Sequence, residues 1–415
     1  MDNFDVIVVG AGPSGMMAAI SATQSGAKVA LIDKNKKVGK KLLMTGGGRC
    51  NVTNSKPVEE ILQNVPGNGR FLYSAFDQFS NLDIIQFFKK NGVQLKEEDH
   101  GRLFPVTDKS QTIVETLFNK ILSLGVKYLP NTSVIEMLID EGQVIGVQTK
   151  TEKILASSVI LSTGGKAYPS TGSTGDGYTF AKSAGHTITE LYPTESPLIS
   201  HEKFILDKTL QGISLRDVKL SVVNAKGKKL AQHQLDMLFT HFGLSGPAAL
   251  RCSSFINKEL AKGEKSVRVL LDIFPEKSEN DLKKFLTGLS KNNAKSVKNV
   301  FSEILQERIL IFMLEQAGIN PAQPAKQLSE KDFDSFVKKI KNFEIRIDST
   351  FPIEKSFVTG GGVNLKEINP KTMESKLIRG LFMTGELLDI NGYTGGYNVT
   401  CAFVTGFVAG KHAVA

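Results

Sequence analysis

The 415-residue chain contains no tryptophan, only three cysteines and only six histidines. The cysteines, at positions 50, 252 and 401, are odd in number and far apart, which excludes a disulfide framework and a paired-cysteine metal site. The histidines show no ligand spacing either, so we expect no metal. A chain without a disulfide pattern suits a reducing compartment, and we expect a cytoplasmic protein.

Long apolar runs are also missing, since no stretch approaches the roughly 18 uninterrupted apolar residues of a membrane span. The acidic start at residues 1–5 leads directly into a strand pattern, so no signal peptide is expected. Hydrophobic residues make up 41% of the chain and charged residues 22%, which is ordinary globular composition. The 51 basic and 42 acidic side chains give a net charge of +9, which suits either an anionic partner or a solvated basic surface.

A strand, a glycine turn, a helix and a second strand fill the start of the chain. The β-branched run at 4–9 suits a buried parallel strand, and helical composition follows from 16 to 25. A second apolar strand at 28–32 ends at Asp33. This is a complete β-α-β unit in about thirty residues.

The turn of this unit reads GAGPSG, from Gly10 to Gly15. Gly10 permits the tight turn, Gly12 lets the backbone approach a pyrophosphate, and Gly15 lets the helix pack against the strand. The helix N-terminus offers free N–H groups to phosphates. Asp33, eighteen residues after Gly15, is placed to accept hydrogen bonds from an adenosine ribose. The unit predicts dinucleotide binding, with a purely structural glycine turn as the alternative.

Three later segments favour FAD over NAD(P). VILSTGG at 159–165 returns the chain beneath the same pyrophosphate, and GLFMTGE at 380–386 is a strand that ends in a glycine-acid pair. GGYN at 395–398 opens a last helix, whose N-terminus would stabilise negative charge on a reduced flavin ring. No second strand-GxGxxG-helix unit follows, so a dedicated nicotinamide domain is not expected.

Composition divides the rest of the chain. Helical periodicity dominates from about 57 to 125, and short strands follow from 126 to 163. We predict an α/β fold with a discontinuous FAD-binding domain, 1–190 and 356–415, interrupted by an inserted substrate or cap domain at 191–355. Within the insert, short strand-like runs suit a small barrel or sandwich, whereas the Lys-, Glu- and Asn-rich part is helical. The strand-like part is 191–275 with about 345–355, and the helical part is 276–345.

Four segments carry a family resemblance: GKKLLMTGGGRCNVTN at 39–54, STGGKAYPSTGSTGDG at 162–177, THFGLSGPAAL at 240–250 and GLFMTGELLDINGYTGGYN at 380–398. In these segments, and over essentially its whole length, the chain resembles the bacterial FAD flavoproteins of the aminoacetone oxidase family, also called YhiN-like or BaiN-like. The resemblance implies a glutathione-reductase-like FAD-binding Rossmann domain with an insert that carries a β-barrel and helices. The family commonly has Glu at the end of the second strand. The side chain of Asp33 is shorter, but its carboxylate can still accept hydrogen bonds from the ribose.

The composition of the TGGGRCN block at 45–51 suits cofactor binding, independently of the family resemblance. Residues 45–48 offer backbone N–H groups with little side-chain bulk, suited to wrapping a phosphate or a flavin edge, and neighbouring cations add positive charge. A compact structural loop is the alternative. The residues expected to bind FAD are Gly10, Gly12, Pro13, Ser14, Gly15, Asp33, Lys34, Lys40, Lys41, Thr45, Gly46, Gly47, Gly48, Arg49, Cys50, Asn51, Thr163, Gly164, Gly165, Gly385, Glu386, Asp389, Gly396, Tyr397, Asn398 and Val399.

The catalytic residue is not evident, because flavin chemistry asks little of side chains. His241 is a candidate for a substrate pocket or for a structural cap, and Arg102 for binding an anionic substrate or for pairing with neighbouring acids. Lys166 and Tyr168 follow the glycine turn at 163–165 and are expected close to the cofactor. Cys50 could act as a flavin-linking or redox thiol, but a lone cysteine is more often a small packed residue.

Three functions are open at this point. The resemblance implies an FAD-dependent amine oxidase that converts aminoacetone, with O2 and water, to methylglyoxal, ammonia and hydrogen peroxide. Its BaiN branch implies an NAD(P)H-dependent reductase of ene or 3-oxo-steroid type instead. An RNA-modifying flavoprotein is prompted by the net charge and the Lys-rich segment 276–345, but that segment lacks the aromatic interleaving of a stacking platform. The oxidase with a small-molecule substrate is favoured, and neither a membrane nor a nucleic-acid partner is expected.

Overall fold

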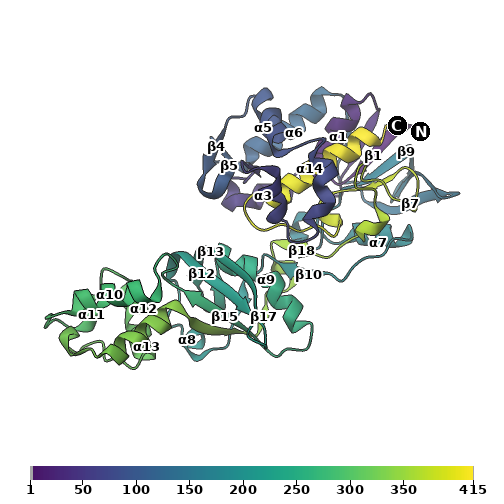
Figure 1. The fold of residues 1–415 in the computed structure, drawn as a ribbon. Coiled ribbons are helices and arrows are strands. Elements are labelled where there is room, and N and C mark those ends of the chain that lie inside the picture. Colours follow the sequence, from purple (N-terminus) through teal and green to yellow (C-terminus); the bar gives the residue numbers. More distant parts are fainter. Residues whose placement is uncertain (1–2, 415) are drawn as a thin grey trace. The chain divides into compact units, whose positions relative to one another are not determined.

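The computed structural model describes residues 3–414 and separates into two compact units (Figure 1). Unit 1 comprises the chain up to Thr194 and from Ile353 onward, and unit 2 comprises Glu195–Pro352. Unit 2 is therefore one continuous insertion in unit 1. No helix in the described part of the chain is both long and apolar enough to cross a membrane.

The central sheet of unit 1 consists of β1 (Phe4–Val9), β2 (Val29–Ile32), β6 (Lys127–Leu129), β7 (Val134–Asp140), β8 (Gln143–Thr149), β9 (Lys153–Leu161) and β19 (Leu381–Met383). Its order is β6-β2-β1-β9-β8-β7, and β19 pairs with the last residues of β9. Strand β1 is parallel to both of its neighbours, β2 and β9, and its buried residues are all apolar. A strand covered on both faces needs such a continuous apolar run, which is why the sequence signal was clear.

Two helices pack face to face beside this sheet, α1 (Pro13–Gln24) and α14 (Tyr397–His412), as Figure 1 shows. Their close approach depends on two glycines of α14. A Cβ at Gly406 would lie 2.2 Å from the carbonyl oxygen of Ser14, and one at Gly410 would lie 2.2 Å from that of Ala18. The small residues of the last helix therefore bring the C-terminal end of the chain onto the first helix.

The segment predicted to be helical from 57 to 125 contains a β-hairpin as well. Helices α3 (Val58–Gln63), α4 (Tyr73–Phe76), α5 (Asn81–Lys90) and α6 (Ser110–Ser123) surround β4 (Leu95–Glu98) and β5 (Arg102–Pro105). The purely helical prediction is wrong for residues 95–105, because His100 and Gly101 adopt positive φ and reverse the chain between the two strands. Strand β5 also pairs with β3 (Thr53–Asn54), which anchors the hairpin to the TGGGRCN block.

Unit 2 holds an antiparallel sheet of seven strands in the order β16-β15-β12-β13-β14-β11-β17. The edge strands β16 and β17 are separated by Asp348 alone, so the two ends of the sheet meet there as in a partly open barrel. The strands are β11 (Leu198–Ile199), β12 (Ser214–Val223), β13 (Lys229–Phe239), β14 (Gly243–Ser245), β15 (Val267–Asp272), β16 (Phe343–Ile347) and β17 (Ser349–Thr350).

Helices cover this sheet and complete the core of unit 2. They are α8 (Lys203–Leu206), α9 (Pro247–Leu260), α10 (Glu279–Ser290), α11 (Val297–Val300), α12 (Glu307–Gln316) and α13 (Glu330–Lys341). Phe204, Phe312 and Phe343 form a ring cluster with centroids 5.2 to 5.6 Å apart that joins two helices to β16. The apolar residues of sheet and helices form one continuous core, so the barrel-like part and the helical part fold as a single body.

Candidate functional site

The glycine turn after β1 contains two kinds of glycine. Gly10 has a φ of +105°, and a Cβ there would lie 2.5 Å from the carbonyl oxygen of Ser162. A Cβ at Gly15 would lie 1.8 Å from the carbonyl oxygen of Gly10. These two positions are glycine because the protein's own backbone fills the space. A Cβ at Gly12, in contrast, would meet nothing within 4 Å, so the fold itself leaves open the space into which Gly12 faces.

That open space lies at the N-terminus of α1. The N-cap residue is Gly12, Pro13 follows it, no side chain caps the helix, and its first turn contains no acid. The hydroxyl of Ser14 donates to Thr384 Oγ1 at 2.6 Å and so is turned toward the sheet. An uncapped helix N-terminus beside open space is suited to hold a phosphate group through its N–H groups and its dipole.

Asp33 at the end of β2 is tied to this turn. Its Oδ2 accepts a hydrogen bond from the backbone N–H of Ala11 at 2.7 Å, and its Oδ1 accepts from the backbone N–H of Asn35 at 2.7 Å. Lys40 donates to Asn35 Oδ1 at 2.9 Å, whereas Lys34 pairs with Asp176 at 2.5 Å. The carboxylate thus fixes the turn, and the two lysines are engaged with protein groups around it.

The TGGG segment, η1 (Thr45–Gly48), follows α2 (Lys40–Met44) and forms an open loop with left-handed backbone angles instead of a regular 3-10 helix. Gly46, Gly47 and Gly48 have φ of 57°, 66° and 87°. A Cβ at Gly47 or Gly48 would meet nothing within 4 Å, so the loop faces free space. Successive residues in this conformation turn their N–H groups toward one side, which makes a cradle for an anion or a carbonyl edge.

Arg49 and Arg102 both lie near the Phe104 ring. The Arg49 guanidinium is 4.1 Å from the ring centroid and 2.7 Å from Glu98 Oε1, and the hydrogen bond to Glu98 raises the pKa of Arg49. The Arg102 guanidinium is 5.6 Å from the centroid and pairs with Asp99. Of the two interpretations of Arg102, pairing with a neighbouring acid is the one that the structure shows.

The carboxylate of Glu386 is the centre of a second group of expected residues, at the end of β19. Lys41 Nζ lies 2.7 Å from Glu386 Oε2, and the backbone N–H of Thr359 donates to Glu386 Oε1 at 2.8 Å. A Cβ at Gly165 would lie 2.3 Å from Thr359 Oγ1 and 2.9 Å from Glu386 Oε1. Thr163 Oγ1 is buried and has no hydrogen-bond partner within residues 3–414. The turn at 163–165, α2 and the end of β19 therefore converge.

The N-terminus of α14 completes the arrangement. Its N-cap is Gly396 with a φ of 92°, no side chain caps it, and its first turn, which includes Tyr397 and Val399, has no acid. A Cβ at Gly396 would lie 2.7 Å from the carbonyl oxygen of Thr53 and 2.8 Å from Asn51 Oδ1, so the helix begins against the TGGGRCN block. Asn398 holds the preceding loop through Gly392, whose N–H donates to Asn398 Oδ1 at 2.8 Å.

Lys166 and Tyr168 lie at the edge of this group. The backbone N–H of Lys166 donates to Thr359 Oγ1 at 2.9 Å, and its ammonium group is 4.0 Å from Glu354. Tyr168 has a φ of 55° and its ring lies 5.7 Å from that of Phe357. Asp389 lies further along the loop after Gly385, where its backbone oxygen accepts a hydrogen bond from Asn68.

His241 and Cys50 differ in place and in exposure. His241 belongs to unit 2, in the turn between β13 and β14, where its exposed ring lies 5.0 Å from Phe242. Cys50 is fully buried, and burial raises the pKa of its thiol to about 12. A neutral, enclosed thiol suits the small packed residue of the sequence analysis and not a redox group.

Thr359 was missed by the sequence analysis. It contacts both the turn after Gly165 and the Glu386 carboxylate, and it opens the segment TGGG at 359–362. The same four letters occur at 45–48. This repeated glycine run could have drawn attention to the segment, but it does not indicate the contacts that Thr359 makes.

The open space at Gly12, two uncapped helix N-termini, the open TGGG loop and the unpartnered Thr163 hydroxyl fit a dinucleotide with a flavin ring. Within residues 3–414, no group of three or more His, Cys, Asp or Glu residues is placed to hold a metal ion. Fold and site together define an FAD-dependent oxidoreductase with a Rossmann domain, so the predicted α/β class and the predicted cofactor are confirmed.

Comparison with known proteins identifies the family. The model of the HI0933-like protein Rossmann domain matches residues 4–412, and the chain belongs to this family. The YhiN-like and BaiN-like resemblance is thereby confirmed at family level, whereas the aminoacetone oxidase activity stays a prediction.

Several relatives match over nearly their full length, two of them at 30% identity or more. The chain is 30% identical over 410 residues to a 3-dehydro-bile acid delta(4,6)-reductase of Clostridium scindens, with 98% of each chain covered. It is 31% identical over 423 residues to a ribosomal RNA dihydrouridine synthase of Escherichia coli K12, covering 100% of this chain and 99% of the relative. Among solved structures, a 3-ketosteroid delta1-dehydrogenase from Sterolibacterium denitrificans aligns over 100% of both chains with a TM-score of 0.55 at 14% identity, which shows a shared fold alone.

Proposed function

We propose that this enzyme reduces a carbon–carbon double bond conjugated to a carbonyl group, and that its substrate is a uridine in RNA. The observation that carries the proposal is the chemistry shared by the names of the two full-length relatives. A delta(4,6)-reductase of a 3-dehydro-bile acid saturates ring double bonds conjugated to a ketone. Dihydrouridine is uridine whose double bond, conjugated to a ring carbonyl, has been saturated. Both reactions add a hydride to one carbon and a proton to the other.

RNA is favoured over a steroid on two grounds. A third relative, from Haemophilus influenzae and 29% identical over 407 residues with 96% of its length covered, carries the same name of ribosomal RNA dihydrouridine synthase. The net charge of +9 also suits a polyanionic substrate. The sequence argument against nucleic acid rested on missing aromatic platforms, but an enzyme that acts on one extruded base needs a basic surface and a pocket instead. A ribosomal RNA substrate is consistent with the expected cytoplasmic location.

Bound FAD supplies the hydride in such a reaction. The chain's own residues bind and orient it. The N-terminus of α1 beside Gly12 would hold the pyrophosphate, Asp33 fixes the turn that receives it, and Glu386 is placed among donors where it can accept hydrogen bonds from hydroxyl groups. The N–H groups of the open loop at Gly47 and Gly48 are available to a carbonyl oxygen that gains negative charge.

The experiment that tests this proposal uses purified enzyme loaded with FAD, NADPH as donor and unmodified ribosomal RNA as substrate. After nuclease digestion, mass spectrometry should find uridine that has gained two hydrogen atoms, and omission of NADPH should abolish the product. RNA that stays unmodified while the same enzyme consumes NADPH with a conjugated steroid ketone would contradict the RNA substrate and leave the reductase chemistry standing.

Amine oxidation of aminoacetone, the activity that the family resemblance implies, is the competing function. Anaerobic addition of aminoacetone would bleach the oxidised flavin band if the enzyme is an amine oxidase, and admission of air would restore it while producing hydrogen peroxide. We expect no bleaching with aminoacetone and rapid bleaching with NADPH. The opposite pair of results would overturn the proposed reductase.

A further inference from the structure

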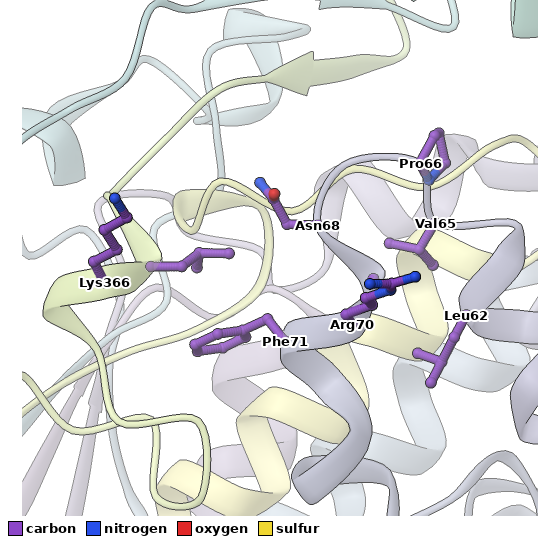
Figure 2. Close-up of a pocket in the computed structure, with 9 residues that line it drawn as sticks. Leu62, Val65, Pro66, Asn68, Arg70, Phe71 and Lys366 are labelled. Atoms are coloured by element: carbon purple, nitrogen blue, oxygen red, sulfur yellow. The ribbon is translucent and has the colours of Figure 1, made fainter.

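A pocket of about 590 Å³ opens in unit 1 outside the group of residues described above. One wall is the segment from α3 to the 3-10 helix η2 (Gly69–Leu72), and the other is the 3-10 helix η7 (Leu365–Glu367). Figure 2 shows Arg70 on one side and Lys366 on the other, with Phe71 and Asn68 between them. None of the nine lining residues is acidic, so the pocket carries positive charge alone.

The two cations of this pocket are free to bind a ligand. Neither Arg70 nor Lys366 makes a side-chain hydrogen bond or an ion pair with any residue of the described range 3–414. The acid that follows Lys366 in the chain, Glu367, is turned away, because its carboxylate accepts from the backbone N–H of Thr187 at 2.9 Å and lies 3.2 Å from His186 Nδ1. Two uncompensated cations on opposite sides of a pocket attract the anionic groups of a ligand that lies in it.

The floor of the pocket is apolar. Leu62 and Val65 are buried on the Arg70 side, and Phe71, on the side toward Lys366, is half-buried. A partly exposed aromatic ring in a pocket with apolar lining provides a face on which a flat ring can stack. The chemical class that combines an anionic group with a flat ring at this size is a nucleotide.

The wall of the pocket is joined to the candidate flavin site by backbone pairing. The N–H of Gly67 donates to the carbonyl oxygen of Asn391 at 3.0 Å, and Asn68 Nδ2 donates to the carbonyl oxygen of Asp389 at 2.8 Å. A Cβ at Gly67 would lie 2.1 Å from Asn391 Nδ2, so the two segments are in close contact. The segment 389–391 belongs to the loop that leads from Glu386 to the N-terminus of α14. The pocket wall therefore contacts the loop that leads into the candidate flavin site.

We propose that this pocket binds a nucleotide, with its phosphate groups held by Arg70 and Lys366 and its base against Phe71. The proposal rests on the proposed function, in which two reactants carry nucleotides: the RNA substrate and the NADPH donor. The pocket belongs to whichever of the two loses affinity when the cations are removed.

The test measures binding directly, so that it does not depend on turnover. Arg70→Glu and Lys366→Glu are compared with wild type and with Lys127→Glu, which changes an exposed lysine at the start of the edge strand β6. Each FAD-loaded protein is titrated with a single-stranded RNA oligonucleotide and, separately, with NADPH. Arg70→Lys keeps the charge and should restore most of the binding.

For the RNA arm, each reversal should weaken binding about tenfold or more, the usual cost of a lost hydrogen bond to a charged group, and lower the salt dependence by about one phosphate contact. For the NADPH arm, a selective loss of about tenfold would assign the pocket to the donor. If both ligands bind the two variants as they bind Lys127→Glu, or if wild type binds neither, the nucleotide pocket is refuted. A wild-type enzyme that binds RNA through these cations but leaves its uridines unmodified would contradict the proposed function alone.

Discussion

Lys41 Nζ lies 2.7 Å from Glu386 Oε2 and joins helix α2 to the end of the last sheet strand across 345 positions of sequence. The side chains are 25% and 20% exposed, so the pair is screened by solvent only in part. The same carboxylate accepts from the backbone of Thr359. One acid thus connects three segments that the chain order keeps far apart.

Glu386→Gln should loosen this connection and weaken FAD binding. The amide keeps one acceptor oxygen for Thr359 but removes the charge that Lys41 faces, and loss of a charge-assisted hydrogen bond costs about 1.5–3 kcal/mol. We expect a drop in FAD affinity of about tenfold or more, measured by flavin fluorescence during dilution. Glu60→Gln, which removes the acid of the exposed Lys56–Glu60 pair, is the matched control and should leave FAD affinity unchanged.

Gly12→Val should give a folded protein without FAD. The space at Gly12 is empty of protein atoms, so the added side chain does not disturb the fold but occupies the place of the pyrophosphate. The ratio of flavin to protein absorbance should fall close to zero while the circular dichroism spectrum stays that of wild type. A fully yellow variant would contradict the placement of the cofactor.

Gly15→Ala, in contrast, should destabilise the fold itself. Its Cβ would lie 1.8 Å from the carbonyl oxygen of Gly10, and backbone cannot yield as a flexible side chain does. We expect a loss of about 3 kcal/mol or more in the free energy of unfolding, measured by urea denaturation of the apo-proteins. Equal stability of the Gly15→Ala and Gly12→Val variants would show that the two glycines do not have separate roles.

The local part of the site could be predicted from the sequence. The turn from Gly10 to Gly15 lies within one β-α-β unit, so its spacing alone specifies strand, turn, helix and the position of Asp33. The roles of Thr359 and Lys41 could not be predicted in this way, because they depend on which distant segments the sheet brings together. Glu386 comes to the site because the strand before it, β19, pairs with β9. Neither segment carries a periodic pattern that predicts this pairing.

The β4–β5 hairpin shows a second limit of the sequence analysis. Its strands are four residues each, and the turn between them depends on a left-handed His100, although only a few per cent of non-glycine residues adopt that conformation. Flanking helices with strong apolar periodicity dominated the interpretation of the whole segment. The hairpin matters for the site because it carries Phe104, on which Arg49 lies.

The three cysteines should be unreactive in the native enzyme. All are buried, and burial raises the pKa of Cys50 and of Cys401 to about 12 and that of Cys252 as well. Because the thiolate is the reactive form, a disulfide reagent such as Ellman's reagent should titrate almost no thiol at pH 8, and three thiols after unfolding. Rapid labelling of Cys50 in the folded protein would contradict this prediction and support Cys50 as a redox thiol.

His186 links helix α7 (Asp176–Ser183) to the C-terminal part of unit 1 and should make that unit sensitive to acid. Its Nδ1 lies 3.2 Å from Glu367 Oε2, and its Nε2 lies 2.8 Å from Ser375 Oγ. Burial lowers the pKa of His186, and the Glu367 carboxylate offsets part of that effect. The folded state therefore favours the neutral ring, while the unfolded state takes up a proton below about pH 6.5.

The sign of the pH effect follows from this difference. Above about pH 6.5 the ring is neutral in both states, and as the pH falls below that value the unfolded state binds the proton more readily, so stability declines. The lowered pKa of Glu367 adds a loss of the same sign at lower pH. We expect the melting temperature of wild type to fall between pH 7.5 and 5.5, and that of His186→Gln, which cannot titrate, to fall less over the same range. The half-buried His233, whose pKa burial lowers to about 4, keeps a residual slope in the variant. Parallel curves for the two proteins would show that His186 does not carry the effect.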